Sequence, residues 1–475
     1  MPDPLFPILV SGSGKEALRF GEQALTYDDL AAVAGGLAAE LPRGRVAVWA
    51  TPTLHTSVAV VAALLAGVPA VPVNPKIGER ELAHIVTDSE PQLVLTEPGA
   101  ELPAGLADLP RRDIPLTGAS AEIAPEPDAE TPALIVYTSG TTGPPKGVVL
   151  PRRSIATTLD ALEDAWGWTA DDVLVHALPL FHVHGLILGI LGPLRRGGSV
   201  RHLGRFSTDG VARELSAGAT MLFGVPTMYH RIAGEVGTNE ALADALRSAR
   251  LLVSGSAALP VHDHQRITEA TGQQVVERYG MTETLMNTSV RADGERKPGT
   301  VGVPLGGVEL RLIGDAGEPI DDLESVGEIQ VRGPNLFTEY LNRPDATAAA
   351  FDGGWFRTGD MATRDADGYV KIVGRKATDL IKSGGYKIGA GEIENALLEH
   401  PGVAEAAVTG EPDDDLGERI VAWIVPAGSP PPTAEELADH VARLLSPHKR
   451  PRVVRYLDAL PRNDMGKVMK RALGA

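Results

Sequence analysis

Residues 137–147 read YTSGTTGPPKG, a run of hydroxyls and glycines that ends in one lysine and a further glycine. The run follows four apolar residues, 133–136, which predict a buried strand. Glycines let backbone N–H groups approach a phosphate, hydroxyls donate hydrogen bonds to its oxygens, and Lys146 adds positive charge. A Walker A loop would place Ser or Thr after the lysine, whereas Gly147 stands there. We therefore predict a phosphate-binding loop of another kind; the alternative is a polar turn without a ligand.

Composition narrows the class of protein. The chain has 475 residues, of which 43% are apolar, enough for two or more domains. The net charge of −18 argues against general nucleic-acid binding and means that an anion site must gather lysine or arginine locally. The absence of cysteine excludes disulfides, thiolate catalysis and Cys-ligated zinc. No apolar run is long enough to cross a bilayer, and residues 1–10 lack a signal-peptide pattern, so we expect a cytoplasmic protein with no membrane partner.

Short apolar strands alternate with helical segments rich in Ala and Leu. Residues 46–49 and 70–73 predict strands, and 57–65 and 79–88 predict helices, so the fold class is α/β. Residues 97–129 predict a surface connection. The pattern is rich in β-strands after residue 308, and a polar stretch at 375–379 marks the main domain boundary, which leaves a small α/β domain at 380–475.

Two further polar stretches follow predicted strands. They are residues 254–258, SGSAA, and residues 277–284, ERYGMTET. Ligands of α/β proteins bind at the carboxyl ends of strands. Tyr279 offers a ring for an adenine, Gly280 permits close approach to it, and Glu283 is an oxygen ligand suited to Mg²⁺ beside a triphosphate. The alternative for Glu283 is a surface carboxylate or a helix cap.

Three more residues complete the candidate nucleotide site. Asp360 can accept hydrogen bonds from two ribose hydroxyls, or it closes a turn after Gly359. Arg375 can add a donor near the ribose. Lys467 follows a glycine near the end of the chain, and taken alone it is an ordinary surface lysine.

Together these stretches resemble the adenylate-forming superfamily of acyl-CoA synthetases, luciferases and adenylation domains, from about residue 20 to the end. The resemblance implies a large multi-layered N-terminal domain (1–374), a hinge (375–379) and a smaller mobile C-terminal domain (380–475). It also implies two half-reactions. A carboxylate attacks the α-phosphate of MgATP and releases pyrophosphate; the small domain then rotates, and the thiol of coenzyme A attacks the acyl carbon.

The resemblance also assigns residues. It implies that ATP is held by Thr138, Ser139, Gly140, Thr141, Thr142, Lys146, Ser256, Ala257, Glu277, Arg278, Tyr279, Gly280, Thr282, Asp360 and Arg375. It implies catalytic roles for Thr282, Glu283 and Lys467, with Glu283 as the metal ligand, and a coenzyme A contact at Ser383, Gly384 and Gly385. The family usually has Asp or Lys at the position of Ala377, so the pivot is open among Lys376, Thr378 and Asp379.

The acid is indicated by two stretches that the family places at the acyl pocket, residues 179–185 and 226–231. The first supplies His182 and His184, which could alternatively be ordinary core residues. Ser254 is a third candidate for the acyl pocket. The second supplies Arg231, and a buried arginine suits a substrate with a second carboxylate. The alternative for Arg231 is a solvated helix face.

The sequence is similar to malonyl-CoA synthetases, so we expect a malonate–CoA ligase that also tolerates methylmalonate. The alternative is a CoA ligase for a short-chain or aryl monocarboxylic acid. Amino-acid adenylation is disfavoured, because Phe181 and His182 stand where that branch carries an Asp. A nucleotide-binding protein with a dead site is disfavoured because Lys467, Glu283 and Asp360 are all present.

Overall fold

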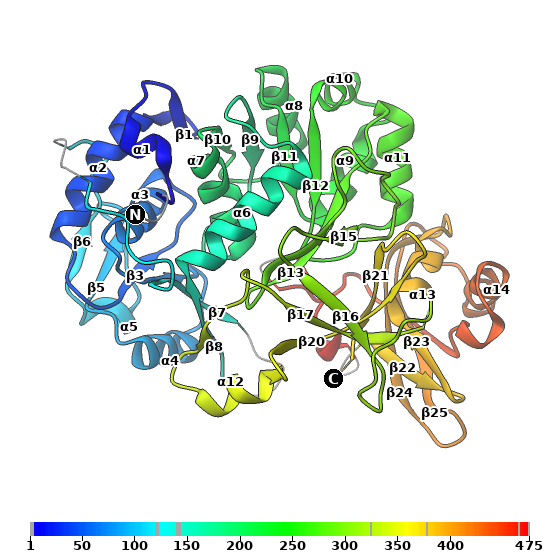
Figure 1. The fold of residues 1–475 in the computed structure, drawn as a ribbon. Helices are drawn as coiled ribbons and strands as arrows, with labels where there is room; N and C mark the ends of the chain where they lie inside the picture. Colours follow the sequence, from blue (N-terminus) through cyan, green and yellow to red (C-terminus); the bar gives the residue numbers. More distant parts are fainter. Residues whose placement is uncertain are drawn as a thin grey trace.

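A computed structural model describes residues 4–118, 123–138, 144–323, 325–376, 379–463 and 466–473 of the chain. Within these ranges four β-sheets organise an α/β fold, as predicted (Figure 1). Ser139, Gly140, Thr141, Thr142, Ala377 and Thr378 lie outside the described residues. No helix within the described residues is long and apolar enough to cross a membrane.

The largest sheet has nine strands and carries the predicted adenine and acyl segments. In spatial order its strands are β15 (Val303–Pro304), β14 (Leu285–Ser289), β13 (Val276–Met281), β12 (Leu251–Ser254), β11 (Met221–Gly224), β9 (Val173–His176), β10 (Ser199–His202), β1 (Glu16–Phe20) and β2 (Gln23–Thr26). From β13 to β1 the neighbours run parallel, so β12 and β13 present their carboxyl ends at the same edge.

A seven-stranded sheet carries the phosphate-loop segment. Its order is β18 (Glu339–Tyr340), β8 (Lys146–Pro151), β7 (Pro132–Thr138), β4 (Ala70–Val73), β3 (Val46–Trp49), β5 (Leu93–Thr96) and β6 (Arg111–Asp113). The strands predicted at 46–49, 70–73 and 133–136 are confirmed. Residues 97–129 are more structured than a plain connection, since β6 extends the sheet beside β5.

Two five-stranded sheets complete the chain. The first contains β16 (Glu309–Ile313), β17 (Gly327–Arg332), β19 (Phe351–Asp352), β20 (Trp355–Arg364) and β21 (Val370–Arg375). The second contains β22 (Leu380–Ser383), β23 (Tyr386–Gly389), β24 (Val403–Asp413), β25 (Gly417–Pro426) and β26 (Val453–Tyr456). The chain therefore changes sheets between β21 and β22, where the sequence predicts the hinge.

Helices cover the sheets. They are α1 (Pro7–Ser11), α2 (Tyr27–Glu40), α3 (Leu54–Leu65), α4 (Glu79–Ser89), α5 (Ala104–Ala107), α6 (Arg152–Trp166), α7 (Gly192–Arg196), α8 (Thr208–Ser216), α9 (Pro226–Glu235), α10 (Glu240–Ser248), α11 (Val261–Thr271), α12 (Pro344–Ala350), α13 (Ala390–Leu398) and α14 (Ala434–Leu444). Short 3₁₀ turns occur at η2 (Pro447–Lys449) and η3 (Lys470–Ala472), and η1 (His184–Leu191) is a π-helix.

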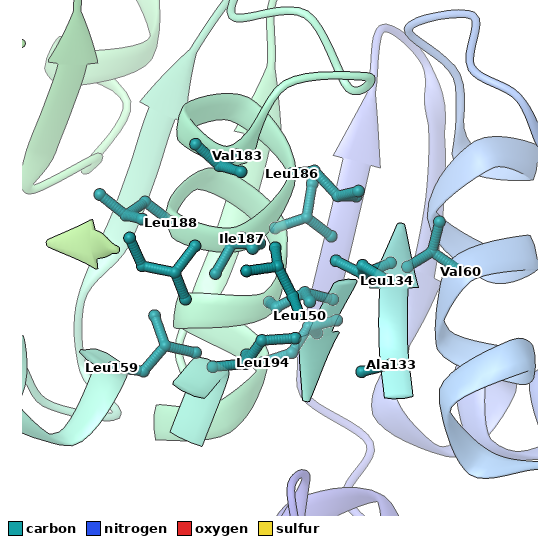
Figure 2. Packing of buried hydrophobic residues seen from close by; sticks show 14 of the residues in the cluster. Val60, Ala133, Leu134, Leu150, Leu159, Val183, Leu186, Ile187, Leu188 and Leu194 are labelled. Atoms are coloured by element: carbon teal, nitrogen blue, oxygen red, sulfur yellow. The ribbon is translucent and has the colours of Figure 1, made fainter. Parts of the chain in front are cut away.

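One hydrophobic core joins the two large sheets. Side chains of α3, α6 and η1 pack between strands of the seven-stranded and nine-stranded sheets. Figure 2 shows this packing, with Leu186 and Ile187 of η1 close to Leu150 of β8 and Leu134 of β7. Because both sheets share this core, the strands β7 and β8 are held in a fixed position relative to β12 and β13.

Candidate active site

The phosphate-loop segment forms the connection between two antiparallel strands. Thr138 ends β7 and is paired with Lys146, which begins β8. The Nζ atom of Lys146 lies 4.0 Å from the ring centroid of Tyr340. The Tyr340 hydroxyl donates a hydrogen bond of 2.8 Å to Oε1 of Glu283. Tyr340, which the sequence analysis missed, therefore brings the lysine of the loop and the predicted metal ligand together.

Glu283 and Thr282 lie in the turn between β13 and β14. Both residues are 6% exposed. The backbone N–H of Phe337 donates to the carbonyl of Glu283 at 2.8 Å, which fixes the turn against a distant segment. A buried carboxylate beside a lysine is an arrangement suited to a metal ion on a polyphosphate.

Asp360 is the centre of a second polar group. It lies in β20 opposite Arg375 of β21, so the alternative of a turn-closing aspartate is wrong. Arg375 Nε lies 2.8 Å from Oδ1 of Asp360, and the Tyr279 hydroxyl donates to Oδ2 at 2.6 Å. Burial raises the pKa of Asp360, and Arg375 and Tyr279 oppose that rise. The structure therefore unites three residues that the sequence assigned to adenine and ribose.

Lys467 reaches this region from the C-terminal part of the chain. It is exposed, and its backbone N–H donates to Oδ1 of Asn463 at 2.9 Å. A Cβ placed on Gly466 would lie 3.0 Å from Oγ1 of Thr227 in α9, so this turn rests against the large domain. The positive charge of Lys467 is close enough to lower the pKa of Asp360. In Figure 1 the red C-terminal stretch runs back from the small domain toward the large one.

Arg278 of β13 is the most unusual side chain of the site. It is 4% exposed, and its Nε and Nη2 atoms make no hydrogen bond within the described residues. A Cβ on Gly255 would collide with its guanidinium carbon, so the arginine lies against the segment that follows β12. Burial lowers the pKa of Arg278 to about 9. An arginine buried without a partner is costly and calls for an anion.

His182 and His184 lie close to Arg278. Burial and the nearby charge of Arg278 lower the pKa of His182 to about 4 and hold that of His184 well below its usual value. Both are therefore neutral near pH 7. His184 Nδ1 lies 3.3 Å from the Ser256 hydroxyl, while its Nε2 and the Ser254 hydroxyl are buried without a partner in the described part of the chain. His184 begins η1, and π-helical turns occur often at functional sites.

Arg231 differs from the expectation. It lies on α9, which begins at Pro226, but its side chain is exposed. The predicted burial of Arg231 is therefore wrong, because the face of α9 that packs inward carries Tyr229 and Ile232 instead. In the structure the buried arginine is Arg278 rather than Arg231.

Three predicted nucleotide residues have other surroundings than expected. Glu277 is buried and accepts hydrogen bonds from the N–H groups of Leu259 (3.1 Å) and Gly299 (3.3 Å). A Cβ on Gly280 would collide with the carbonyl of Leu285, so this glycine is required by the β13–β14 hairpin. Ala257 is exposed. The predicted stretch 277–284 does not follow a strand, since its first five residues belong to β13.

The predicted coenzyme A segment is a hairpin turn in the small domain. Gly384 and Gly385, with φ of 58° and 82°, connect β22 to β23, a turn that needs two positive φ angles. Ser383 before them is 6% exposed. Tyr386 after them stacks on His448 with ring centroids 4.1 Å apart. These contacts lie within the small domain, apart from the residues around Asp360.

Asp379 anchors the chain between β21 and β22. Its carboxylate accepts from the N–H of Arg375 at 3.1 Å and pairs with Lys470 at 3.0 Å, and Lys470 also pairs with Glu394 at 2.8 Å. Lys376 pairs instead with Glu328 of the large domain at 3.0 Å. Lys376 and Asp379, two of the three candidates for the pivot, therefore pair with opposite domains, and the third, Thr378, lies outside the described residues.

Comparisons with known proteins agree with this geometry. Residues 10–341 match the AMP-binding enzyme family, and residues 392–467 match the AMP-binding enzyme C-terminal domain. The chain is 37% identical to a malonate–CoA ligase of Arabidopsis thaliana, over 95% of this chain and 80% of the plant protein.

Two solved structures are informative. A malonyl-CoA ligase in a ternary product complex with methylmalonyl-CoA and AMP is 72% identical, covering 96% of this chain and 100% of that one, with a TM-score of 0.76. ATP-bound MatB from Rhodopseudomonas palustris is 35% identical, covering 99% and 97%, with a TM-score of 0.90. The chain belongs to the AMP-binding enzymes, the family of adenylate-forming proteins that its motifs resemble.

Proposed function

We propose that this protein is an ATP-dependent malonate–CoA ligase, which forms malonyl-CoA through malonyl-adenylate and releases AMP and pyrophosphate. We include methylmalonate among its substrates, because a pocket discriminates weakly against one added methyl group. Two of the relatives named above, the plant malonate–CoA ligase and the malonyl-CoA ligase with methylmalonyl-CoA bound, support this substrate class.

The observation that carries the proposal is the buried guanidinium of Arg278, whose Nε and Nη2 atoms make no hydrogen bond within the described residues. Malonate has two carboxylates, of which one must react and the other must enter the pocket as an anion. A carboxylate beside Arg278 would satisfy its free N–H groups in a charge-assisted pair. Neutral His184 and Ser254 offer further hydrogen bonds, and a monocarboxylic acid would leave Arg278 unpaired.

In the first half-reaction an oxygen of malonate attacks the α-phosphorus of MgATP, and the bond to the bridging oxygen of pyrophosphate breaks. We propose that Lys146 and the loop around it hold the outer phosphates and that Thr282 contacts the α-phosphate. Glu283, a hard oxygen ligand, holds the Mg²⁺ that accompanies ATP. Lys467 stabilises the negative charge that develops on the α-phosphate oxygens, the largest contribution expected in a dry phosphoryl-transfer site.

In the second half-reaction the coenzyme A thiolate attacks the acyl carbon, and AMP leaves. We propose that residues 375–379 act as the hinge and that the Ser383–Gly385 turn then faces the thiol. The contact of Gly466 with Thr227 and the closeness of Lys467 to Asp360 support an adenylation arrangement in this structure. The higher TM-score against ATP-bound MatB than against the more identical product complex agrees with that assignment.

ATP–pyrophosphate exchange with a panel of acids tests the proposal. Malonate and methylmalonate should support exchange with a higher kcat/KM than butyrate or benzoate, and mass spectrometry should detect malonyl-CoA after coenzyme A is added. Faster exchange with butyrate or benzoate than with malonate would instead establish a monocarboxylate ligase.

A further inference from the structure

A cluster of metal-ligand side chains lies outside the proposed active site. It consists of His230 on α9 and His262 and Asp263 in the first turn of α11. One donor atom of each residue lies within 4.8 Å of the other two. The catalytic argument above uses none of the three.

The geometry of the cluster centres on one oxygen. Oδ1 of Asp263 lies 3.2 Å from Nδ1 of His230 and 3.1 Å from Nε2 of His262. Ligand atoms at the corners of a tetrahedral zinc site are about 3.4 Å apart, as follows from metal–ligand bonds of about 2.0–2.2 Å. Each imidazole nitrogen is therefore already close to the spacing from the carboxylate oxygen that a small divalent ion requires, and the two nitrogens lie within 4.8 Å of each other.

The burial of the cluster is that of a site with one open side. Asp263 is fully buried, His262 is 17% exposed at its side chain, and His230 is 49% exposed. The histidine nitrogens face the carboxylate of Asp263, which lies at the buried end of the cluster. The half-exposed ring of His230 leaves a path by which an ion can enter.

Charged residues of both signs surround the cluster. Glu405 of β24 and Arg266 of α11 lie near His230, and Glu405 is itself paired with Arg462. On the same helix, Thr227 touches the turn that carries Lys467, and α11 packs against α13 of the small domain. The cluster thus lies where the small domain meets the large one.

We propose that His230, His262 and Asp263 form a binding site for a divalent transition-metal ion of the Zn²⁺ class, distinct from the Mg²⁺ that accompanies ATP. Two imidazoles and one carboxylate are the ligand set that such ions prefer over Mg²⁺, which takes oxygen ligands. On binding, the two nitrogens that face Asp263 give up their protons and coordinate the ion. The ion ties α9 to α11 beneath the docked small domain.

The test uses the full chain, without a histidine tag or nucleotide, stripped with a chelator and desalted. Calorimetric titration with ZnCl₂ should give one ion per chain. His230→Gln and His262→Gln should each weaken that affinity by about tenfold or more, since each removes one ligand. His448→Gln, in a histidine outside the cluster, and Glu283→Gln, in the proposed Mg²⁺ ligand, should bind Zn²⁺ like the parent.

The absence of saturable Zn²⁺ binding would overturn the proposal, and so would a loss of less than tenfold in His230→Gln and His262→Gln. Because His230 is half-exposed, its substitution leaves the buried packing intact, and circular dichroism should confirm a folded variant. Weakened binding in Glu283→Gln alone would assign the ion to the nucleotide site and reject the second site. None of these outcomes depends on which acid the enzyme activates.

Discussion

Substitution of Arg278 by Met gives the sharpest test of the substrate assignment. Removing one partner of a buried charge-assisted pair costs about 2–5 kcal/mol, or roughly 30- to 5000-fold in kcat/KM at about 1.4 kcal/mol per decade. Arg278→Met should lower kcat/KM for malonate by that factor. It should spare or raise kcat/KM for butyrate, because a monocarboxylate brings no second charge into the pocket.

The same substitution should raise the thermal stability of the protein when no acid is bound. Burial lowers the pKa of Arg278 to about 9, so the charged form is disfavoured in the folded chain by several kcal/mol. Met relieves that cost, and Arg278→Met should therefore melt at a higher temperature than the parent when no acid is present. Malonate should stabilise the parent against heat and leave the variant unchanged.

ATP–pyrophosphate exchange and differential scanning fluorimetry, each with malonate and with butyrate, measure these effects. Arg231→Met serves as the matched control, because Arg231 is exposed and should leave the malonate-to-butyrate preference within about threefold of the parent. If Arg231→Met abolishes that preference and Arg278→Met keeps it, the reasoning from burial is refuted.

Three further predictions follow from the site. Lys467→Ala should abolish malonyl-adenylate formation yet spare transfer from pre-formed adenylate to coenzyme A; quench-flow measurement of both steps checks this, and equal loss of both contradicts it. Glu283→Gln should reduce pyrophosphate exchange by about 10²-fold or more with circular dichroism unchanged, and full activity would remove Glu283 from the site. The pKa of Glu277 is raised from 4.5 to about 7 by burial, so its contribution to stability is present below pH 4.5 and lost as pH rises to about 7. Thermal melts of the parent and of Glu277→Gln should therefore diverge in slope across that window, and parallel curves would show that Glu277 does not titrate there.

The local pattern of the sequence predicted the elements well. The strands at 46–49 and 70–73 and the helices that include 57–65 and 79–88 appear in the structure, because apolar period and flanking turn residues are local properties. The sequence also indicated a place near the ribose for both Asp360 and Arg375, and the structure brings the two side chains into contact.

The direction in which each side chain points could not be predicted from the sequence. The resemblance assigned Arg231 to the acyl pocket and Arg278 to the ATP site, and only the packing of α9 and β13 shows that the first is exposed and the second buried. Tyr340 reaches Glu283 from 57 positions along the chain, a contact that no local pattern encodes. The union of His230 with His262 and Asp263 likewise depends on how α9 and α11 meet.

The small domain has a hydrophobic core of its own, which includes Ile388, Ile393 and Val408 and shares no member with the core of the large sheets. Leu460 and Val468, on either side of Lys467, pack with β24 and β25 of the small domain, while Tyr279 packs against the core of the large sheets. Loss of either core ends adenylation, so the heat resistance of catalysis is set by whichever core melts first. If the small domain melts first, the protein would still bind nucleotide but would be inactive. Substitutions that stabilise the small domain should then raise the heat resistance of catalysis more than substitutions around the nucleotide site.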